Sequence, residues 1–488
     1  MTEWTYASAA DTAKALAAKK VSSVELTQQV IGRIERFDKQ LNAVCVRDFD
    51  RALEAARAAD AAIAKGEKKP LLGVPVTIKE SFNLAGTATT WGFPHGKDYI
   101  APEDALAVTR VKDAGAVIVG KTNVPQALAD WQSYNAIYGT SNNPYDLTRT
   151  PGGSSGGSAA ALAAGYGSLS LGSDIGGSLR VPAHFCGVTA HKPTWNLAPS
   201  RGQTPPFIPA LPGDIDLAVI GPMARNVGDL VTVLDIIAGP DPLSDGGAYT
   251  LALPPARHEF MKDFRVLVLD SHPLSPISKA VSDGVARVEE VLRKGGAKVE
   301  RSSAALPDLA ENGKLYMRLL LGTLGATFPP DIYENITQLV KTLDPNMPVL
   351  AAERLRGMVM SHRDWFFADA ARRGLRMQWR AFFQQFDAVV CPVLPTPAFP
   401  HDHSENAAER ALKVDDKIMI YQDQLLWPGV ATLPGLPATS IPAGLSNEGL
   451  PVGVQIIGPW LEDRTPLKLA ALIERELGGF VAPKGYAD

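Results

Sequence analysis

Cysteine is scarce in this sequence, and long apolar segments are missing. The 488 residues include three cysteines, Cys45, Cys186 and Cys391, at spacings that suit neither a zinc site nor a set of disulfides. No stretch approaches the ~20 consecutive apolar residues of a membrane span. The N-terminal segment also lacks the basic start and the apolar run of an export signal. We therefore expect a reduced, cytoplasmic protein that holds no metal and contacts no membrane.

An excess of one charge is absent too. The chain has 48 lysines and arginines against 52 aspartates and glutamates, which gives a net charge of -4 at pH 7. No run of basic residues is long enough to follow a phosphate backbone, so nucleic acid is not expected as a direct partner. Hydrophobic residues make up 45% and charged residues 20%. These values are close to the averages of soluble globular proteins, so the chain can bury a core.

Helical and strand patterns alternate along most of the chain. A capping box at Ser22 and Glu25 predicts the start of an amphipathic helix, and an Ala-rich segment from about 51 to 65 predicts a second one. Apolar or alternating runs predict strands in LLGVPVTIKESF, AVIVG, SLSLGSD, FRVLVLD and AKVE. This alternation favours an α/β fold with a central, mostly buried sheet. The proline-rich residues 203–214 predict a long irregular loop, either functional or a plain surface excursion.

A run of glycine and serine, PGGSSGGS, is the most conspicuous local feature. It has no lysine, which excludes a P-loop, and a strong helix former, SAAALAA, follows it, which disfavours a flexible linker. Ser154 and Ser155 each match the G-x-S-x-G pattern of a nucleophile elbow. However, no buried strand precedes the run, and the later histidines, such as His362, His401 and His403, lie in polar segments. A Ser-His-Asp hydrolase is therefore disfavoured.

A second glycine-serine motif follows in GSDIGGSLR. A predicted strand ends at Asp174 and leads into Gly176, Gly177 and Ser178. Paired glycines let the backbone turn tightly and present consecutive N–H groups beside the serine hydroxyl. That arrangement is typical of an oxyanion hole next to its own nucleophile. A tight turn with an incidental serine is the alternative that the pattern leaves open.

Together, PGGSSGGSAAALAAG and LGSDIGGSLRVPAHFCGVTAHKPT closely resemble the amidase signature family of serine hydrolases. Further segments resemble other landmarks of that family; they are GVPVTIKESF, GKTNVPQ, GPMARNVGDL, CPVLPTPAF and GLPATSIPAGLSNEGLPVGVQIIG. The resemblance extends roughly from Leu26 to Gly458. It implies the amidase signature fold, in which helices flank a large mixed central β-sheet.

The resemblance also implies a single amidase domain over residues 1–488. We expect N-terminal helices in about 7–66, a signature core in about 70–240, and the C-terminal part of the same sheet in about 260–488. A homodimer is left open.

Position by position, the resemblance makes Ser178 the nucleophile, Ser154 a bridging serine after a cis peptide bond, and Lys79 the base. From the residues alone, Lys121 and Lys192 compete with Lys79. A lysine can act as a base near neutral pH only where burial and neighbours lower its pKa. Lys79 closes an apolar strand, where such burial is expected.

Other residues take supporting roles by the same resemblance. The backbone N–H groups of an oxyanion hole are those of Ile175, Gly176, Gly177 and Ser178. Leu128 lines the acyl side of the site. The aromatic Trp131, Phe207 and Trp427 instead suggest from their side chains an apolar or aryl substrate pocket, and a place in the hydrophobic core is an equal alternative for them. The hydrogen-bonding residues around the site are Ser155, Asp174 and Arg180, and an ordinary structural ion pair between Asp174 and Arg180 is an equal alternative. The chain departs from the family pattern at Glu80, where aspartate is common, and at Gln126, where many members have an acidic residue.

The expected function is that of an amidase without a metal or organic cofactor. It would cleave the C–N bond of a small-molecule carboxylic amide to an acid plus an amine or ammonia, through an acyl-enzyme. Apolar or aryl amides are the favoured substrates, and esters or carbamates are further candidates. Two alternatives stay open: the A subunit of a glutamyl-tRNA amidotransferase, and a non-catalytic scaffold of the same fold.

Overall fold

The computed structural model describes residues 4–244, 246–248, 250–404, 406 and 409–486. In this part of the chain, eleven strands form one mixed sheet in the order β1-β3-β2-β6-β8-β7-β14-β15-β11-β9-β10. Their bounds are β1 Val44–Arg47, β2 Pro75–Lys79, β3 Val117–Thr122, β6 Leu169–Asp174, β7 Thr189–Lys192, β8 Val219–Ala224, β9 Arg265–Val268, β10 Lys298–Glu300, β11 Ala388–Pro392, β14 Ala438–Leu445 and β15 Pro451–Ile457. Two short hairpins stand apart, β4 Tyr134–Asn135 with β5 Gly139–Thr140 and β12 Ala411–Val414 with β13 Lys417–Ile420.

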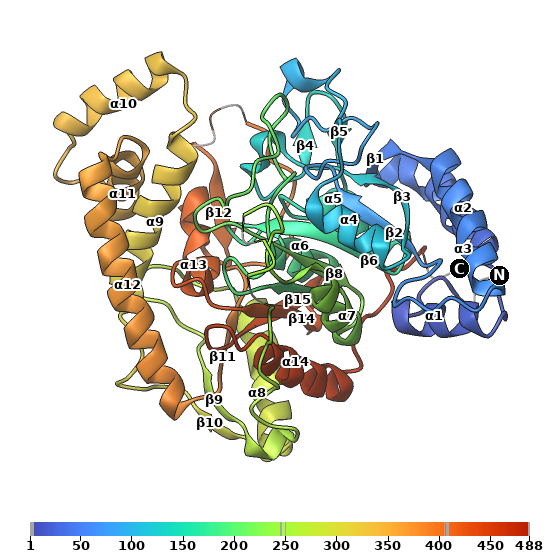
Figure 1. The fold of residues 1–488 in the computed structure, drawn as a ribbon. Coiled ribbons are helices and arrows are strands. Elements are labelled where there is room, and N and C mark those ends of the chain that lie inside the picture. Colours follow the sequence, from blue (N-terminus) through green and yellow to red (C-terminus); the bar gives the residue numbers. More distant parts are fainter. Residues whose placement is uncertain (1–3, 245, 249, 405, 407–408, 487–488) are drawn as a thin grey trace.

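Helices cover the sheet and extend beyond one side of it (Figure 1). Their bounds are α1 Ala9–Ala17, α2 Ser23–Leu41, α3 Phe49–Ala64, α4 Leu106–Asp113, α5 Gly156–Ala163, α6 Arg180–Cys186, α7 Val227–Ile237, α8 Lys279–Lys294, α9 Leu309–Gly325, α10 Pro330–Lys341, α11 Val349–Met358, α12 His362–Gln385, α13 Leu426–Thr432 and α14 Arg464–Leu477. Helices α1 to α3 lie at one end of the molecule, and α9 to α12 gather on the opposite side (Figure 1). The expected α/β fold with a large mixed sheet is confirmed.

Parallel and antiparallel pairings both occur in the sheet. Strand β2 runs parallel to β3 and to β6, whereas β6 pairs antiparallel with β8. Every residue of β2, β3 and β6 is buried, as expected for strands that are covered on both faces. Because neighbouring parallel strands end at the same edge, the carboxyl ends of β2 and β6 lie close together.

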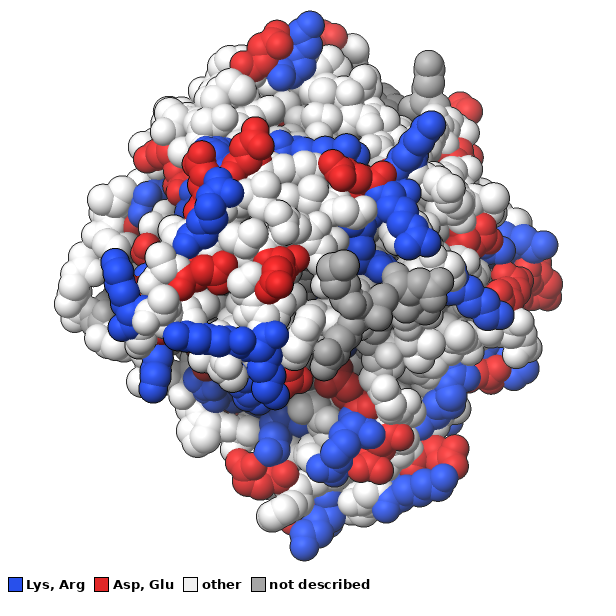
Figure 2. Space-filling model, turned by 90° about the vertical axis from the view of Figure 1, so that its right-hand side faces the viewer, with Lys and Arg blue, Asp and Glu red and all other residues white. Residues whose placement is uncertain are grey.

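The predicted local elements agree with the structure at their centres. The capping box at Ser22 and Glu25 is formed, and helix α2 follows it. The predicted strands correspond to β2, β3, β6, β9 and β10. No helix or strand occurs in the described residues between β7 and β8, so 203–214 form the predicted irregular loop. Side chains of both charges intermingle on the face seen in Figure 2. None of the described helices is long and apolar enough to cross a membrane.

Candidate active site

Lys79 is the last residue of β2, and its side chain is fully buried. Its Nζ donates hydrogen bonds to Ser154 Oγ at 2.6 Å and to Ser173 Oγ at 2.9 Å. Ser173 lies near the end of β6, the parallel neighbour of β2. Three distant segments of the sequence therefore meet at the amine of Lys79.

Burial lowers the pKa of Lys79 to about 7, while the nearby carboxylates of Asp174 and Glu80 act in the opposite direction. The loss of hydration is the largest influence, because a charged amine is disfavoured away from water. A substantial fraction of Lys79 is therefore neutral near pH 7. A neutral amine can accept a proton from Ser154.

The two competing lysines are also buried, but they point elsewhere. Lys121 Nζ donates to Thr89 Oγ1 at 2.7 Å and to the carbonyl of Ala88. Lys192 Nζ donates to two carbonyl groups, those of Pro193 at 3.0 Å and Leu436 at 2.8 Å. Among the described residues, Lys79 is the one of these three lysines that donates a hydrogen bond to a serine of the glycine-rich run.

The glycine-rich run carries Ser154 in a closely packed backbone. The peptide bond between Gly153 and Ser154 is cis. A Cβ atom at Gly153 would lie 2.3 Å from the carbonyl oxygen of Asp130, so only glycine fits there. The backbone N–H of Ser155 donates to the carbonyl of Ser178 at 3.2 Å. The run and the second glycine-serine motif are therefore joined directly.

Ser178 lies in the turn between β6 and α6. It is 6% exposed, whereas Ser154 is 1% exposed and Lys79 is fully buried, so Ser178 is the most accessible of the three. Among the described residues, the Ser178 hydroxyl has no recorded hydrogen-bond partner. The Lys79–Ser154 link of the expected relay is present here, and the Ser154–Ser178 link is open.

Asp174 and Arg180 form a fully buried ion pair, with Arg180 Nη2 at 2.9 Å from Asp174 Oδ1. The remaining guanidinium N–H groups bind further acceptors, which are Asp174 Oδ2, the carbonyl of Pro428, Gln455 Oε1 and Thr432 Oγ1. Despite burial, the pKa of Asp174 is below its ordinary value because Arg180 favours the carboxylate. The two residues thus form an ion pair, and Asp174 also accepts hydrogen bonds from backbone N–H groups on either side of Ser178.

One of the expected oxyanion donors is already engaged. The N–H of Gly177 donates to Asp174 Oδ1 at 2.9 Å, and the N–H of Leu179 donates to Asp174 Oδ2 at 3.1 Å. Among the described residues, no hydrogen-bond acceptor is found for the N–H groups of Ile175, Gly176 and Ser178. In this structure the N–H of Gly177 is therefore bound to the carboxylate of Asp174, whereas the other three expected donors have no such partner in the described part of the chain.

The four expected substrate-binding residues are dispersed. Trp131 is close to the turn, since its Nε1 donates to the carbonyl of Gly176 at 3.0 Å. Leu128 follows Ala127, and both have left-handed backbones, with φ of 58° and 57°. Phe207 is 63% exposed on the irregular loop and packs against Tyr99. Trp427 is fully buried in α13 beside the ring of His272. Of these four residues, Trp131 is the one with a hydrogen bond to the turn among the described residues.

Two residues near the site were not predicted from the sequence. Ser173 binds Lys79 Nζ, and Tyr316 Oη donates to the carbonyl of Ile175 at 2.7 Å. Ser173 precedes Asp174 in a predicted strand, so a hydroxyl at that strand end was an available signal. Tyr316 lies in the middle of α9 and gave no local signal.

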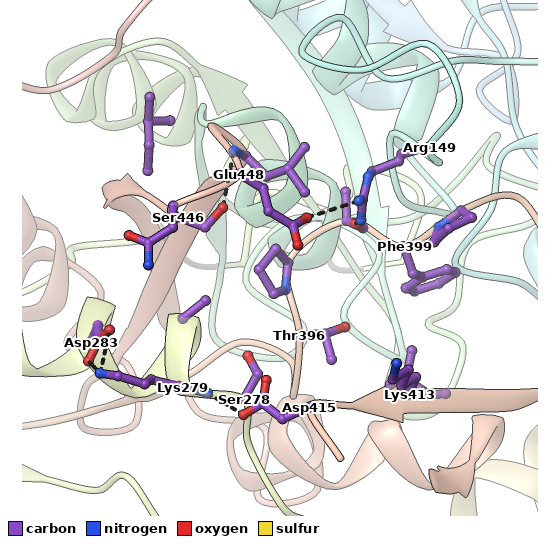
Figure 3. A pocket seen from close by; sticks show the side chains of 18 of the residues that line it. Arg149, Ser278, Lys279, Asp283, Thr396, Phe399, Lys413, Asp415, Ser446 and Glu448 are labelled. Atoms are coloured by element: carbon purple, nitrogen blue, oxygen red, sulfur yellow. Dashed lines mark hydrogen bonds and ion pairs between the residues drawn. The ribbon is translucent and has the colours of Figure 1, made fainter. Parts of the chain in front are cut away.

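Figure 3 shows a cavity of about 720 Å³ that is lined by other residues. Its lining includes Arg149, Phe399 and Glu448, and none of the expected catalytic residues. Its wall residue Tyr421 contacts the ring of Trp131 edge-on, with ring centroids 5.5 Å apart. Trp131 therefore contacts both a wall residue of this cavity and the Gly176 turn. Within the described residues, no group of three His, Cys, Asp or Glu side chains could hold a metal ion.

Comparisons with known proteins agree with the motifs and the fold. A model of the family described as Amidase matches residues 25–467. The A subunit of the glutamyl-tRNA(Gln) amidotransferase of Desulfatibacillum aliphaticivorans is 32% identical over 482 residues, which cover 93% of this chain and 94% of that protein. The indoleacetamide hydrolase of Bradyrhizobium diazoefficiens is 33% identical over 484 residues, which cover 96% of this chain and 86% of that protein.

A solved structure has a similar fold over nearly the whole chain. It is described as a vestigial protein complex that reveals the origins of an s-triazine catabolic enzyme, and it superposes with a TM-score of 0.79 at 28% identity. The superposition covers 98% of this chain and all of that one. Since the family model spans most of the sequence and the relatives match over nearly their whole lengths, the chain belongs to the amidase signature family.

Proposed function

We propose that this protein cleaves the C–N bond of carboxylic amides through a serine acyl-enzyme, with Ser178 as nucleophile, Ser154 as relay and Lys79 as base. One observation carries the proposal: the buried amine of Lys79, whose pKa is lowered to about 7, lies 2.6 Å from Ser154 Oγ. A base with a pKa near the working pH is suited to transfer protons in both directions.

The chemistry follows from these positions. Neutral Lys79 takes the proton of Ser154 as Ser154 takes the proton of Ser178, and Ser178 Oγ attacks the amide carbonyl. The N–H groups of Ile175, Gly176 and Ser178 stabilise the negative oxygen that forms. The relay then protonates the leaving amine, and water hydrolyses the acyl-enzyme by the reverse path. Closure of the Ser154–Ser178 contact on substrate binding accords with the loose hydrogen bonds of many unliganded enzymes.

The A subunit of a glutamyl-tRNA amidotransferase is a second candidate, and the relatives' names favour it over a free-standing amidase. Near-full-length relatives such as that of Desulfatibacillum aliphaticivorans carry this name. In that role the amide is glutamine, and the ammonia passes to a partner protein. The same three residues would serve, so the two candidates differ in substrate and partner. The relative named indoleacetamide hydrolase favours an aryl amide instead, and the nearby Trp131 is consistent with an aryl group.

A non-catalytic scaffold has less support. A buried lysine without a carboxylate partner in direct contact reduces stability, and a scaffold gains nothing from Lys79 beside Ser154. The retained combination of Lys79, Ser154 and Ser178 favours an enzyme.

The purified chain, without any added partner, can be assayed for ammonia release from indoleacetamide, benzamide and glutamine. Hydrolysis of an aryl amide supports the free-standing amidase. Release of ammonia from glutamine alone supports the amidotransferase role. Ser178→Ala should abolish either activity, and Ser302→Ala, at an exposed serine, is the matched control. Unchanged hydrolysis by Ser178→Ala would exclude Ser178 as the nucleophile.

A further inference from the structure

Four consecutive carbonyl groups in the turn before α6 each accept a hydrogen bond. The carbonyl of Ile175 accepts from Tyr316 Oη at 2.7 Å, and the carbonyl of Gly176 accepts from Trp131 Nε1 at 3.0 Å. The carbonyl of Gly177 accepts from the N–H of Val181 at 2.7 Å, and the carbonyl of Ser178 accepts from the N–H of Ser155 at 3.2 Å. The last two donors belong to the backbone of segments that border the turn. The first two are side chains from α9 and from the loop before β4, far away in the sequence.

These bonds fix the directions of the N–H groups. In a trans peptide unit, the C=O and the N–H point in opposite directions. The bond from Tyr316 to the carbonyl of Ile175 therefore orients the N–H of Gly176. The bond from Trp131 to the carbonyl of Gly176 orients the N–H of Gly177, which meets Asp174 at 2.9 Å.

The turn needs such support because its own residues restrain it weakly. Gly177 has a φ of +96°, a conformation that L side chains rarely adopt, and a second glycine precedes it. Glycine accepts a wide range of backbone angles, so the peptide units beside Gly176 can rotate more easily than ordinary ones. Rotation of the unit between Ile175 and Gly176 would replace an N–H donor by a carbonyl oxygen, which repels a negative charge.

We propose that Tyr316 is a positioning residue of the oxyanion site, which holds the carbonyl of Ile175 so that the N–H of Gly176 stays aligned for the reaction. Trp131 supports the same turn, because it fixes the next peptide unit, whose N–H is bound to Asp174. This inference rests on the proposed function of Ser178. Neither side chain needs to touch the substrate for this role.

The surroundings of Tyr316 suit a fixed donor. Its side chain is fully buried, and burial raises the pKa of its hydroxyl, so the proton stays in place at neutral pH. A Cβ atom at Gly429 of α13 would lie 2.4 Å from the Tyr316 ring. Glycine at that position therefore makes room for the ring, which reaches the turn across α13.

Tyr316→Phe removes the hydroxyl and keeps the ring. On the amide that the wild-type chain hydrolyses fastest, we expect kcat to fall about 10-fold while KM changes less than about 2-fold; loss of a direct oxyanion donor costs roughly 100-fold or more. Phenylboronic acid forms a tetrahedral serine adduct with a negative oxygen, and its affinity, measured by titration calorimetry, should fall by about the same factor as kcat. Tyr166→Phe is the control, since Tyr166 is fully buried and its hydroxyl has no recorded partner among the described residues.

Thermal unfolding of each variant shows whether it is folded, and Trp131→Phe, which deletes the indole N–H, provides a second test. The proposal is overturned if both variants match Tyr166→Phe in kcat and boronate affinity, or if KM rises while kcat is unchanged. Full hydrolysis by Ser178→Ala would instead overturn the proposed function. If the wild type cleaves none of the tested amides, boronate affinity replaces kcat as the measurement. It is valid for this purpose if Ser178→Ala abolishes boronate binding, and the change in affinity caused by Tyr316→Phe then measures the effect on the turn.

Discussion

Lys79 owes its properties to its position at the end of β2. Burial disfavours its charged form, and the carboxylates of Asp174 and Glu80 offset only part of that effect, so its pKa is about 7. An exposed lysine has an ordinary pKa of about 10.4 and would be almost entirely charged at neutral pH. The hydrogen bond to Ser154 places this amine where the proposed relay needs a base.

The pH dependence of hydrolysis should report the pKa of Lys79. The base must be neutral, so kcat/KM should be low below pH about 7 and should rise as the pH increases through the pKa of about 7. Initial rates measured from about two pH units below that value to about two units above it test this expectation. Lys79→Arg, which stays charged throughout, should be inactive over the whole range. A flat wild-type profile across neutral pH contradicts the assignment.

The buried pair of Asp174 and Arg180 should matter for stability. Asp174→Asn leaves the guanidinium of Arg180 buried without its counterion, which should lower the free energy of unfolding by about 3–5 kcal/mol. Asp283→Asn is the control, because Asp283 pairs with Lys279 on the surface, where their side chains are 46% and 79% exposed; the expected cost is below about 1 kcal/mol. Urea denaturation measures both, and equal midpoints would show that the buried pair contributes little.

At the scale of elements, close backbone contacts place the glycine-rich run. Helix α5 is buried along its whole length. A Cβ atom at Gly157 would lie 2.4 Å from the backbone nitrogen of Asn123, just after β3. The start of α5 can therefore approach the sheet closely, which brings Ser154 within reach of Lys79.

Gly157→Ala should force the start of α5 away from the sheet and destabilise the protein by about 1–3 kcal/mol, as overpacking does elsewhere. Gly32→Ala in α2 is the matched change, since no atom lies within 4 Å of the added Cβ. It should stabilise by about 0.5–1 kcal/mol, because alanine loses less entropy in a helix. Thermal denaturation of the two variants compares their stabilities. Equal shifts of the two midpoints would contradict the prediction that α5 packs too closely against the sheet to accept a side chain at Gly157.

For the molecule as a whole, the sheet joins early and late parts of the chain. Strands from the first half, up to β8, occupy one side of the sheet, and β9, β10, β11, β14 and β15 occupy the other. The N- and C-terminal segments lie side by side (Figure 1). Arg33 of α2 donates to the carbonyl of Tyr486 at 2.7 Å, and the rings of Phe37 and Tyr486 lie 5.1 Å apart.

Tyr486→Ala should therefore loosen α2 from the C-terminal segment. The lost burial of a side chain that is 6% exposed should lower the free energy of unfolding by about 3 kcal/mol. Tyr333→Ala, at a position 40% exposed in α10, should cost less than about 0.5 kcal/mol. Chemical denaturation compares them, and a similar small effect for both would show that the C-terminal contact does not support the fold.

Much of this protein could be predicted from its sequence. The apolar and alternating patterns of the sequence predict α2, β2, β3 and β6, because each pattern lies within a single element. The two glycine-serine motifs with Lys79 indicate the family, since motif residues keep a fixed spacing along the chain. The irregular loop at 203–214 follows from its prolines.

Only the tertiary structure decided which groups meet. It brought Lys79, and not Lys121 or Lys192, into contact with Ser154 and Ser173, since that contact depends on β2 lying beside β6. It engaged the N–H of Gly177 with Asp174, and it brought Tyr316 to the turn. It also left Phe207 exposed on the irregular loop and buried Trp427 in α13. The physical reason is that the local pattern of apolar residues indicates whether a side chain is buried. The partners of that side chain depend instead on how segments far apart in the sequence pack together.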